Sequence, residues 1–388
     1  MKVSCLIISK ILIFLSFLIF SFVQPSARSQ GTNYDYEKIQ IGDVKNLLVW
    51  LALHPDGKTL AVSSHQSFPL YMYNLETKQV VNQFDVGNWY AGSRADYSSH
   101  GKYILLQQLF YMDWSFNKDK QVNFEVFDAT TGKSMLNFGD YHDAKIMPDE
   151  QNLLTLSGTG KVAVHDIQTR KELRAFDVPQ ATNAVAVSSD GKLIAVSHKT
   201  YLPDLKNDPA YKNNKKNQPI LEKYKQQVSV YDYETFNKLY TIDAYYDIIY
   251  RLQYTSDGDY LMIYSIPHTK LQGPAGRKSY VEFADARTGE PLRNSFGSLL
   301  AYEPDFKLSH NKKYFGIISM NTKYPELHLY DFQSNEMLKR FELSYRLFEK
   351  ASEGEFPTDG RASFIFLPGD EEILINYGNR IIKWKIEL

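Results

Sequence analysis

The sequence holds a single cysteine, Cys5, among 388 residues. Cys5 lies in the apolar N-terminal segment, so the remaining chain can form no disulfide, offer no thiolate nucleophile and build no cysteine-based metal site. That remainder must be held together by its apolar core alone, and a domain of roughly 350 residues buries enough surface to do so.

Several motifs are also missing. The chain has no Gly-x-Ser-x-Gly elbow, no complete Gly-x-x-x-x-Gly-Lys-Ser/Thr loop and no His-Glu-x-x-His pair, which argues against the hydrolases, nucleotidases and zinc peptidases that carry them. A formal net charge of −1 argues against a nucleic-acid binder. No linker rich in Pro, Gly or Ser divides the chain, so we expect residues 30–388 to form a single domain.

What the sequence does contain is a unit that recurs about seven times. Each copy begins with a strand pattern and a polar turn, as in 54–58, 99–102, 147–150, 189–192, 256–259, 310–313 and 367–370. A second turn of the aromatic-Asp and Thr-Gly type follows in 73–77, 127–132, 165–169, 231–235, 284–289 and 330–334, with a truncated copy at 383–385. Asp, Asn and Gly favour tight corners between antiparallel strands, so two corners per unit predict four short strands.

Four-stranded repeats of this length are typical of propeller blades. On these motifs the sequence resembles the WD40-like and YVTN-like β-propeller repeat families over nearly all of the chain after the N-terminal segment. The resemblance implies an all-β, seven-bladed β-propeller of four-stranded antiparallel blades. It departs from true WD repeats, because no copy has the Gly-His pair and Tyr, Phe, His or Ala replaces Trp before Asp. The alternative is seven hairpin pairs in another all-β arrangement.

The ends of the chain predict how the ring closes. The last repeat offers three strands, near 362–366, 373–376 and 381–386, so one strand is missing. Residues 36–41 alternate polar and apolar side chains, as a half-buried strand does. We expect this segment to pair on the outside of the last blade and to leave no unpaired edge there.

Residues 1–29 have the layout of a secretory signal peptide. Lys2 begins it, an apolar run covers 11–23, and Ala27 and Ser29 are candidate cleavage positions. An uncleaved membrane anchor over 6–23 is the competing interpretation. Cleavage would change the net charge from −1 to −4, leaving an exported periplasmic or extracellular protein with no membrane span.

The repeats differ most in the connections between their second and third strands. Insertions occupy 108–120, 198–227 and 266–279, and in a propeller they emerge on one face together with the links between blades. The candidate binding residues on this face are Trp89, Tyr90, Phe110, Tyr111, Trp114, Tyr201, Tyr211, Tyr245 and Tyr246. Their expected partner is a protein, peptide or glycan. The alternative is that these are tolerated surface insertions with no partner, because long loops cost little in closure entropy.

Positions counted back from each first turn predict the channel lining. The candidate channel residues are Arg94, Asp96, Asp143, Lys145, Arg251, Asp305 and Lys307. Arg94 is expected to face Asp143, and Arg251 to face Asp305. The alternating charges predict either a hydrated ring of ion pairs or a polar funnel for a small anion, sugar or metal.

The sequence gives little indication of catalysis. His65, His142, His198 and His268 could approach one rim, as a propeller metal hydrolase would need. We therefore predict an exported, non-catalytic recognition or scaffold module with no cofactor, catalytic residue or metal. The alternative is a channel-mouth enzyme of lactonase-like or quinoprotein-like type.

Overall fold

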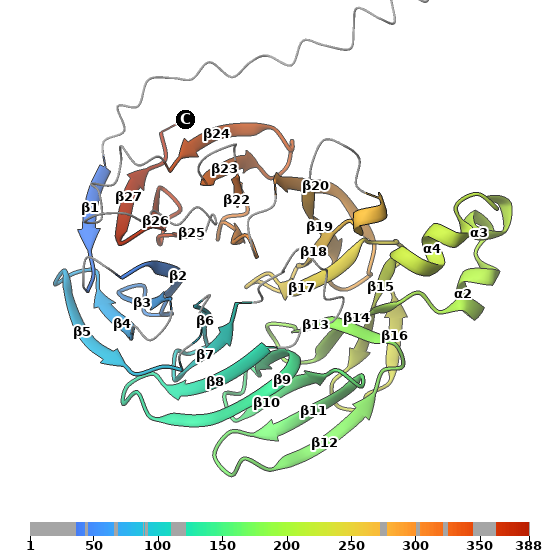
Figure 1. Ribbon diagram of the computed structural model, residues 1–388, viewed down its shortest axis with the longest axis horizontal. Helices are drawn as coiled ribbons and strands as arrows, with labels where there is room; N and C mark the ends of the chain where they lie inside the picture. Colours follow the sequence, from blue (N-terminus) through green and yellow to red (C-terminus); the bar gives the residue numbers. More distant parts are fainter. Residues whose placement is uncertain are drawn as a thin grey trace, which may run out of the picture. The chain divides into compact units, whose positions relative to one another are not determined.

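The computed structural model describes residues 36–42, 46–65, 69–87, 89, 92–109, 122–271, 278–299, 303–320, 325–343 and 362–387. Tyr36–Leu388 forms one compact unit, whereas residues 1–29, the expected signal peptide, lie outside the described residues. The strands of this unit form seven four-stranded antiparallel blades around a central axis (Figure 1). The seven-bladed propeller predicted from the repeats is confirmed.

Blades 1, 4, 5 and 6 are separate sheets of four consecutive strands. Blade 1 contains β2 (Leu48–Leu53), β3 (Thr59–Ser64), β4 (Leu70–Asn74) and β5 (Gln79–Phe84). Blade 4 contains β13 (Ala181–Val187), β14 (Leu193–Lys199), β15 (Gln226–Asp232) and β16 (Lys238–Thr241). Blade 5 contains β17 (Ile248–Tyr254), β18 (Tyr260–Ile266), β19 (Lys278–Asp285) and β20 (Pro291–Leu299). Blade 6 contains β21 (Phe306–Leu308), β22 (Tyr314–Met320), β23 (Pro325–Asp331) and β24 (Met337–Glu342).

Blades 2 and 3 are joined by one long strand, β9 (Ser134–Ile146), which is outermost in blade 2 and innermost in blade 3. Blade 2 also contains β6 (Ser93–Tyr97), β7 (Tyr103–Gln108) and β8 (Val122–Asp128). Blade 3 also contains β10 (Asn152–Ser157), β11 (Lys161–Asp166) and β12 (Glu172–Asp177). Tyr141 and His142 therefore lie inside a strand that continues from one blade to the next.

Blade 7 contains strands from both ends of the described chain. Its order is β1 (Tyr36–Gln40), β27 (Arg380–Lys385), β26 (Glu372–Tyr377) and β25 (Ala362–Phe366). In the antiparallel pair of β1 and β27, Lys38 lies opposite Ile382. The predicted closure by an N-terminal strand is thus confirmed. Glu37 of β1 also forms an ion pair of 2.5 Å with Lys78 of blade 1.

The first turn of every blade requires a residue with positive φ. Four blades place glycine there, such as Gly57 at 72°, and three place Glu150, Lys312 or Asp370. Two of these side chains clamp the preceding blade: Glu150 Oε1 accepts a hydrogen bond of 2.7 Å from the backbone N–H of His100, and Asp370 Oδ2 one of 2.8 Å from that of Asn311. Since glycine tolerates this conformation best, these blades accept some backbone strain and gain a contact between turns.

Apolar side chains fill the spaces between blades. Phe296 of blade 5 stacks on Phe315 of blade 6 with ring centroids 4.2 Å apart, and Phe341 of blade 6 stacks on Trp384 of blade 7 at 4.6 Å. All four are almost completely buried. Each blade therefore depends on its neighbours for its core, as expected for a ring of repeats.

Candidate functional site

The innermost strands of the blades bring the predicted charged residues to a central channel. Arg94 and Asp96 lie on β6, and Asp143 and Lys145 lie on β9. Arg251 lies on β17 and Lys307 on β21, and Asp305 directly precedes β21. Residues two apart point to the same side of a strand, so the intervening Ala95, Ala144, Leu252 and Phe306 point between the blades, where all four are buried.

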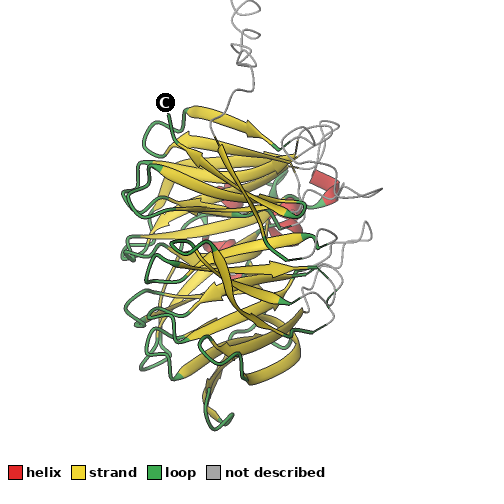
Figure 2. Cartoon of the chain, turned by 90° about the vertical axis from the view of Figure 1, so that its left-hand side faces the viewer, coloured by secondary structure: helices red, strands yellow, loops and turns green. Residues whose placement is uncertain are grey.

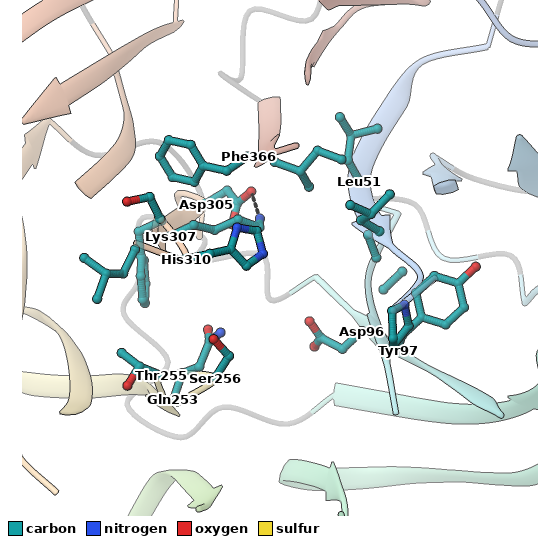
Figure 3. Close-up of a pocket in the computed structure, with 18 of the residues that line it drawn as sticks. Leu51, Asp96, Tyr97, Gln253, Thr255, Ser256, Asp305, Lys307, His310 and Phe366 are labelled. Atoms are coloured by element: carbon teal, nitrogen blue, oxygen red, sulfur yellow. Dashed lines mark hydrogen bonds and ion pairs between the residues drawn. The ribbon is translucent and has the colours of Figure 1, made fainter. Parts of the chain in front are cut away.

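The channel contains a cavity of about 440 Å³ (Figure 3). Figure 3 shows Asp96 and Tyr97 across the cavity from Asp305 and Lys307, with Gln253 between them on a third blade. Turn residues such as His54, Ser99, Ser256 and His310 also line it, so it opens toward the face of the first turns. A second cavity of about 200 Å³ shares Arg94, Asp96 and Arg251 and extends to Lys145.

Three ion pairs in the channel join residues two positions apart along the chain. Arg94 Nε lies 2.9 Å from Asp96 Oδ2, Lys145 Nζ lies 2.8 Å from Asp143 Oδ1, and Lys307 pairs with Asp305. We had expected Arg94 and Arg251 to face carboxylates of the neighbouring blades. Side chains at i and i+2 share one face of the same strand, and this proximity favours the local pairs.

Asp143 and Asp305 also tie neighbouring blades together. Asp143 Oδ2 accepts a hydrogen bond of 3.0 Å from the backbone N–H of Val185 in blade 4. Asp305 Oδ2 accepts one of 3.0 Å from the N–H of Phe364 and one of 2.7 Å from the Ser363 hydroxyl in blade 7. Both carboxylates are buried, so their first role is to satisfy backbone donors at blade junctions.

The Arg94 guanidinium is buried and only partly bonded. Its Nη2 donates to Gln107 Oε1 at 2.6 Å, and its Nε donates to Asp96. Its Nη1 is buried with no hydrogen-bond partner in the described part of the protein. Burial lowers the pKa of Arg94, but Asp96, Asp143 and Glu303 outweigh this effect and raise it overall.

Arg251 is also buried, with a different set of contacts. Its guanidinium carbon lies 3.6 Å from the centroid of the Phe306 ring, and its Nη2 donates to the carbonyl oxygen of Pro304 at 3.2 Å. Its Nε has no hydrogen-bond partner among the described residues, and no carboxylate among them lies within 4.0 Å. Burial, and then repulsion from Arg94, lower the pKa of Arg251 to about 10.

The positive charges of the channel act together on the Asp96 carboxyl group. Burial raises the pKa of this carboxyl group, but Arg94, Lys145, Arg251 and Lys307 together lower it below its usual value. Glu303, just before blade 6, attracts both arginines and was not predicted from the sequence. It lies outside the repeated strand positions, so no sequence pattern indicates it.

The longest insertion, between β14 and β15, folds into three short helices (Figure 1). They are α2 (Leu202–Asn207), α3 (Pro209–Asn213) and α4 (Gln218–Tyr224), which the sequence analysis had not predicted. Leu205 is buried, the Tyr245 hydroxyl donates to Asp208, and Lys225 lies 2.7 Å from Asp247. The insertion is therefore fastened to the connection between blades 4 and 5.

Most of the predicted aromatic contact residues hold the structure together instead. Trp89, Tyr211 and Tyr246 are buried, which corrects our expectation that their rings are offered to a partner. Tyr201 is half-buried and donates to the carbonyl oxygen of Pro179 at 2.7 Å, and Tyr245 binds Asp208 as above. The remaining candidates, Tyr90, Phe110, Tyr111 and Trp114, lie outside the described residues.

What the insertion exposes is positive charge. Residues 199–225 contain seven lysines against Asp204, Asp208 and Glu222. Six of these lysines are exposed: Lys199, Lys206, Lys212, Lys215, Lys216 and Lys223. We call them the insertion lysines. The insertion thus carries a net charge of +4 on a domain whose remainder is acidic.

The four histidines considered for a metal site have contacts of their own. His198 is buried, with Nδ1 2.7 Å from the carbonyl oxygen of Lys199 and Nε2 2.8 Å from the Ser229 hydroxyl. His142 Nδ1 lies 2.8 Å from the carbonyl oxygen of Thr182. His65 Nδ1 accepts from the N–H of Leu47, and His268 packs on Tyr224. No three His, Cys, Asp or Glu side chains of the described ranges form a metal-ligating group.

The insertion of blade 4 and the mouth of the channel cavity lie at opposite ends of the strands. The helices of the insertion occur in a second-to-third connection, whereas first turns line the cavity mouth. Figure 1 shows the three helices of the insertion projecting outward from the side of the ring, and Figure 2 shows many tight turns along one edge of it. None of the helices in the described part of the chain has the length and apolar character needed to cross a membrane.

Comparison with known proteins places this chain among β-propellers. No family model and no curated protein matches the sequence. Among solved structures, the β-propeller domain of Cps50 (Swd1) from Myceliophteria thermophila matches with a TM-score of 0.60 and 14% identity, over 92% of this chain and 99% of that one. Hydrazine synthase from Kuenenia stuttgartiensis matches with a TM-score of 0.58 and 13% identity, over 94% and 99%. At these identities the likeness shows the fold alone.

Proposed function

We propose that this protein is a non-catalytic propeller that recognises an acidic segment of a partner protein through the insertion of blade 4. The observation that carries the proposal is the concentration of the six insertion lysines within one fastened insertion and its first flanking residue. Residues that bind partners concentrate on loops held by a rigid scaffold. A rigid positive surface attracts an acidic partner and steers its approach.

The described internal contacts of the insertion engage its carboxylates more than its lysines. Asp208 accepts from Tyr245, and Glu222 accepts a hydrogen bond of 2.5 Å from the Tyr211 hydroxyl. Of the seven lysines, only Lys225 has a described carboxylate partner, Asp247. Two of the three carboxylates are thus engaged, whereas six ammonium groups face solvent.

We further propose that residues 1–29 are a cleaved signal peptide and that residues 30–388 work as a single exported domain. The charged start, the apolar run and the small residues before Gln30 support this proposal. N-terminal sequencing of the protein recovered from the periplasm or medium tests it. A protein retained in the membrane with Met1 intact would contradict it.

The recognition proposal is tested by reversing charge on the insertion. A variant carrying Lys212→Glu, Lys215→Glu, Lys216→Glu and Lys223→Glu should bind a fluorescent poly-glutamate peptide at least about tenfold more weakly than the parent. Fluorescence anisotropy at low and moderate salt measures the change, and the difference should shrink as salt rises.

A matched control reverses four exposed charges away from the insertion, with Lys133→Glu, Lys171→Glu, Lys192→Glu and Lys385→Glu. This variant has the same net charge, so it should keep most of the binding. Equal losses in the two variants would show only non-specific attraction. Tighter binding of a single-stranded RNA or of heparin than of the peptide would also reject an acidic protein segment as the partner.

A further inference from the structure

We propose that the central cavity binds a sugar acid, a small monoanionic molecule with one carboxylate and several hydroxyl groups, through Arg94, Arg251 and Asp96. This inference does not depend on the role of the insertion, because the two regions share no residue. The cavity volume of about 440 Å³ lies within the usual range for small-molecule sites.

Two arginines that line the cavity each have a buried hydrogen-bond donor with no acceptor among the described residues. Arg94 and Arg251 both line it, both are about 4% exposed, and Arg94 Nη1 and Arg251 Nε lack hydrogen-bond partners among the described residues. Buried guanidinium groups are rarely left unpaired, since they lose hydration without compensation. A carboxylate accepts hydrogen bonds from guanidinium groups in a favourable planar geometry.

The charges around the cavity favour a single negative charge. The cations are Arg94, Lys145, Arg251 and Lys307, and the carboxylates are Asp96, Asp143, Asp305 and Glu303. Asp143 and Asp305 already accept backbone N–H groups and pair with lysines, which leaves them little capacity for a ligand. Repulsion between Arg94 and Arg251 remains, and one carboxylate would relieve it. The formal charges of these eight groups balance, so a ligand with one negative charge disturbs the balance less than a dianionic phosphate does.

The rest of the lining suits hydroxyl groups. Asp96 is 49% exposed, and only its Oδ2 is engaged by Arg94, so its Oδ1 can accept from a ligand. Gln253, Ser99 and Ser256 are exposed neutral side chains on the wall. Phe366 adds an apolar surface (Figure 3). A ligand that places a carboxylate at the two arginines and a hydroxyl group at Asp96 is a polyhydroxy acid.

Isothermal titration calorimetry on the full-length protein tests the site with D-glucuronate, D-galacturonate and D-gluconate. At least one should bind about tenfold or more tightly than D-glucose, which lacks the carboxylate, and than acetate, which lacks the hydroxyl groups. Binding no tighter than these controls for all three probes, or tighter binding of inorganic phosphate, would overturn the proposal.

Variants locate the binding. Asp96→Asn and Arg251→Gln should each weaken it by about tenfold or more. Because Arg251 is buried, its replacement could unfold the ring, so Gln253→Trp serves as the deciding variant: Gln253 is exposed on the wall, and an indole there should fill the cavity and abolish binding. Lys171→Gln on the outer surface is the control. Unchanged binding in a folded Gln253→Trp protein would reject the cavity as the site.

Discussion

The carboxylates of the channel divide into two kinds according to their contacts. Asp305 is buried, pairs with Lys307 and accepts from Ser363 and Phe364 of the next blade. Asp96 is half-exposed to the cavity and has Arg94 as its ion-pair partner. The first kind belongs to the framework of the ring, whereas the second is available to a ligand.

This division predicts unequal costs of substitution. Asp305→Asn should lower the free energy of unfolding by about 2 to 4 kcal/mol, because it leaves Lys307 without its counter-charge and disturbs a blade junction. Asp96→Asn should cost less, about 1 kcal/mol, because Asp96 is half-exposed and the asparagine amide oxygen can still accept a hydrogen bond from Arg94 Nε. Denaturant titration of both variants measures the difference, and equal costs would contradict the assignment.

His198 gives a second prediction, for pH. Its ring is buried against Lys199 and Ser229, and burial lowers the pKa of the imidazole from 6.5 to about 4. The folded protein therefore favours the neutral ring, whereas the unfolded chain takes up a proton near pH 6.5. The stability contribution is complete above that pH and is lost as the pH falls toward 4.

Between pH 7 and pH 4 the parent should lose about 2 to 3 kcal/mol more than a His198→Asn variant, which has no proton to take up there. Urea titrations at several pH values provide the comparison. Parallel pH profiles for the two proteins would show that His198 does not titrate in this way.

Among the elements, β1 has the largest structural consequence. It supplies the outer strand of blade 7 through its pairing with β27, and Glu37 also reaches Lys78 of blade 1. Ile41, directly after it, is fully buried. Loss of this segment would expose the edge of β27 and open the seam of the ring.

A variant that begins at Gly42 should therefore be less stable by about 3 kcal/mol or more than one that begins at Gln30, and it should associate through the open edge. Thermal melts and light scattering measure the two effects. A synthetic peptide covering residues 34–42 should restore part of the stability. Equal melting temperatures without the peptide would contradict closure by β1.

The sequence predicted these elements where local chemistry decides them. The turn at Asp56 and Gly57 is readable because Asp56 accepts the N–H groups of Lys58 and Thr59 and Gly57 adopts φ of 72°. The alternation in residues 36–41 likewise needs only a strand with one buried face.

Features that depend on contacts between residues far apart in the chain could not be predicted from the sequence. Tyr211 and Tyr246 are buried by packing that no local pattern encodes. Arg251 rests on Phe306 of the next blade instead of facing Asp305, and Glu303 approaches both arginines from a connection outside the repeats. The strand positions of the charged residues can be counted in the sequence, but their pairing required the three-dimensional arrangement.

At the scale of the whole molecule, the ring separates two surfaces. The insertion lysines lie in a connection at one end of the strands, and the cavity opens among the first turns at the other. Blades that share their cores form a stiff support between them. A change in one surface is therefore expected to leave the other intact.

The most direct test of the account replaces residues 202–224 with a two-residue Asn-Gly turn and measures poly-glutamate binding and thermal stability together. Gln226 must be kept, because its side-chain oxygen accepts from the N–H of Ile249 at 2.8 Å. The account predicts a melting temperature within about 3 °C of the parent and a loss of binding of about tenfold or more. Undiminished binding by a folded deletion variant would contradict recognition through the insertion.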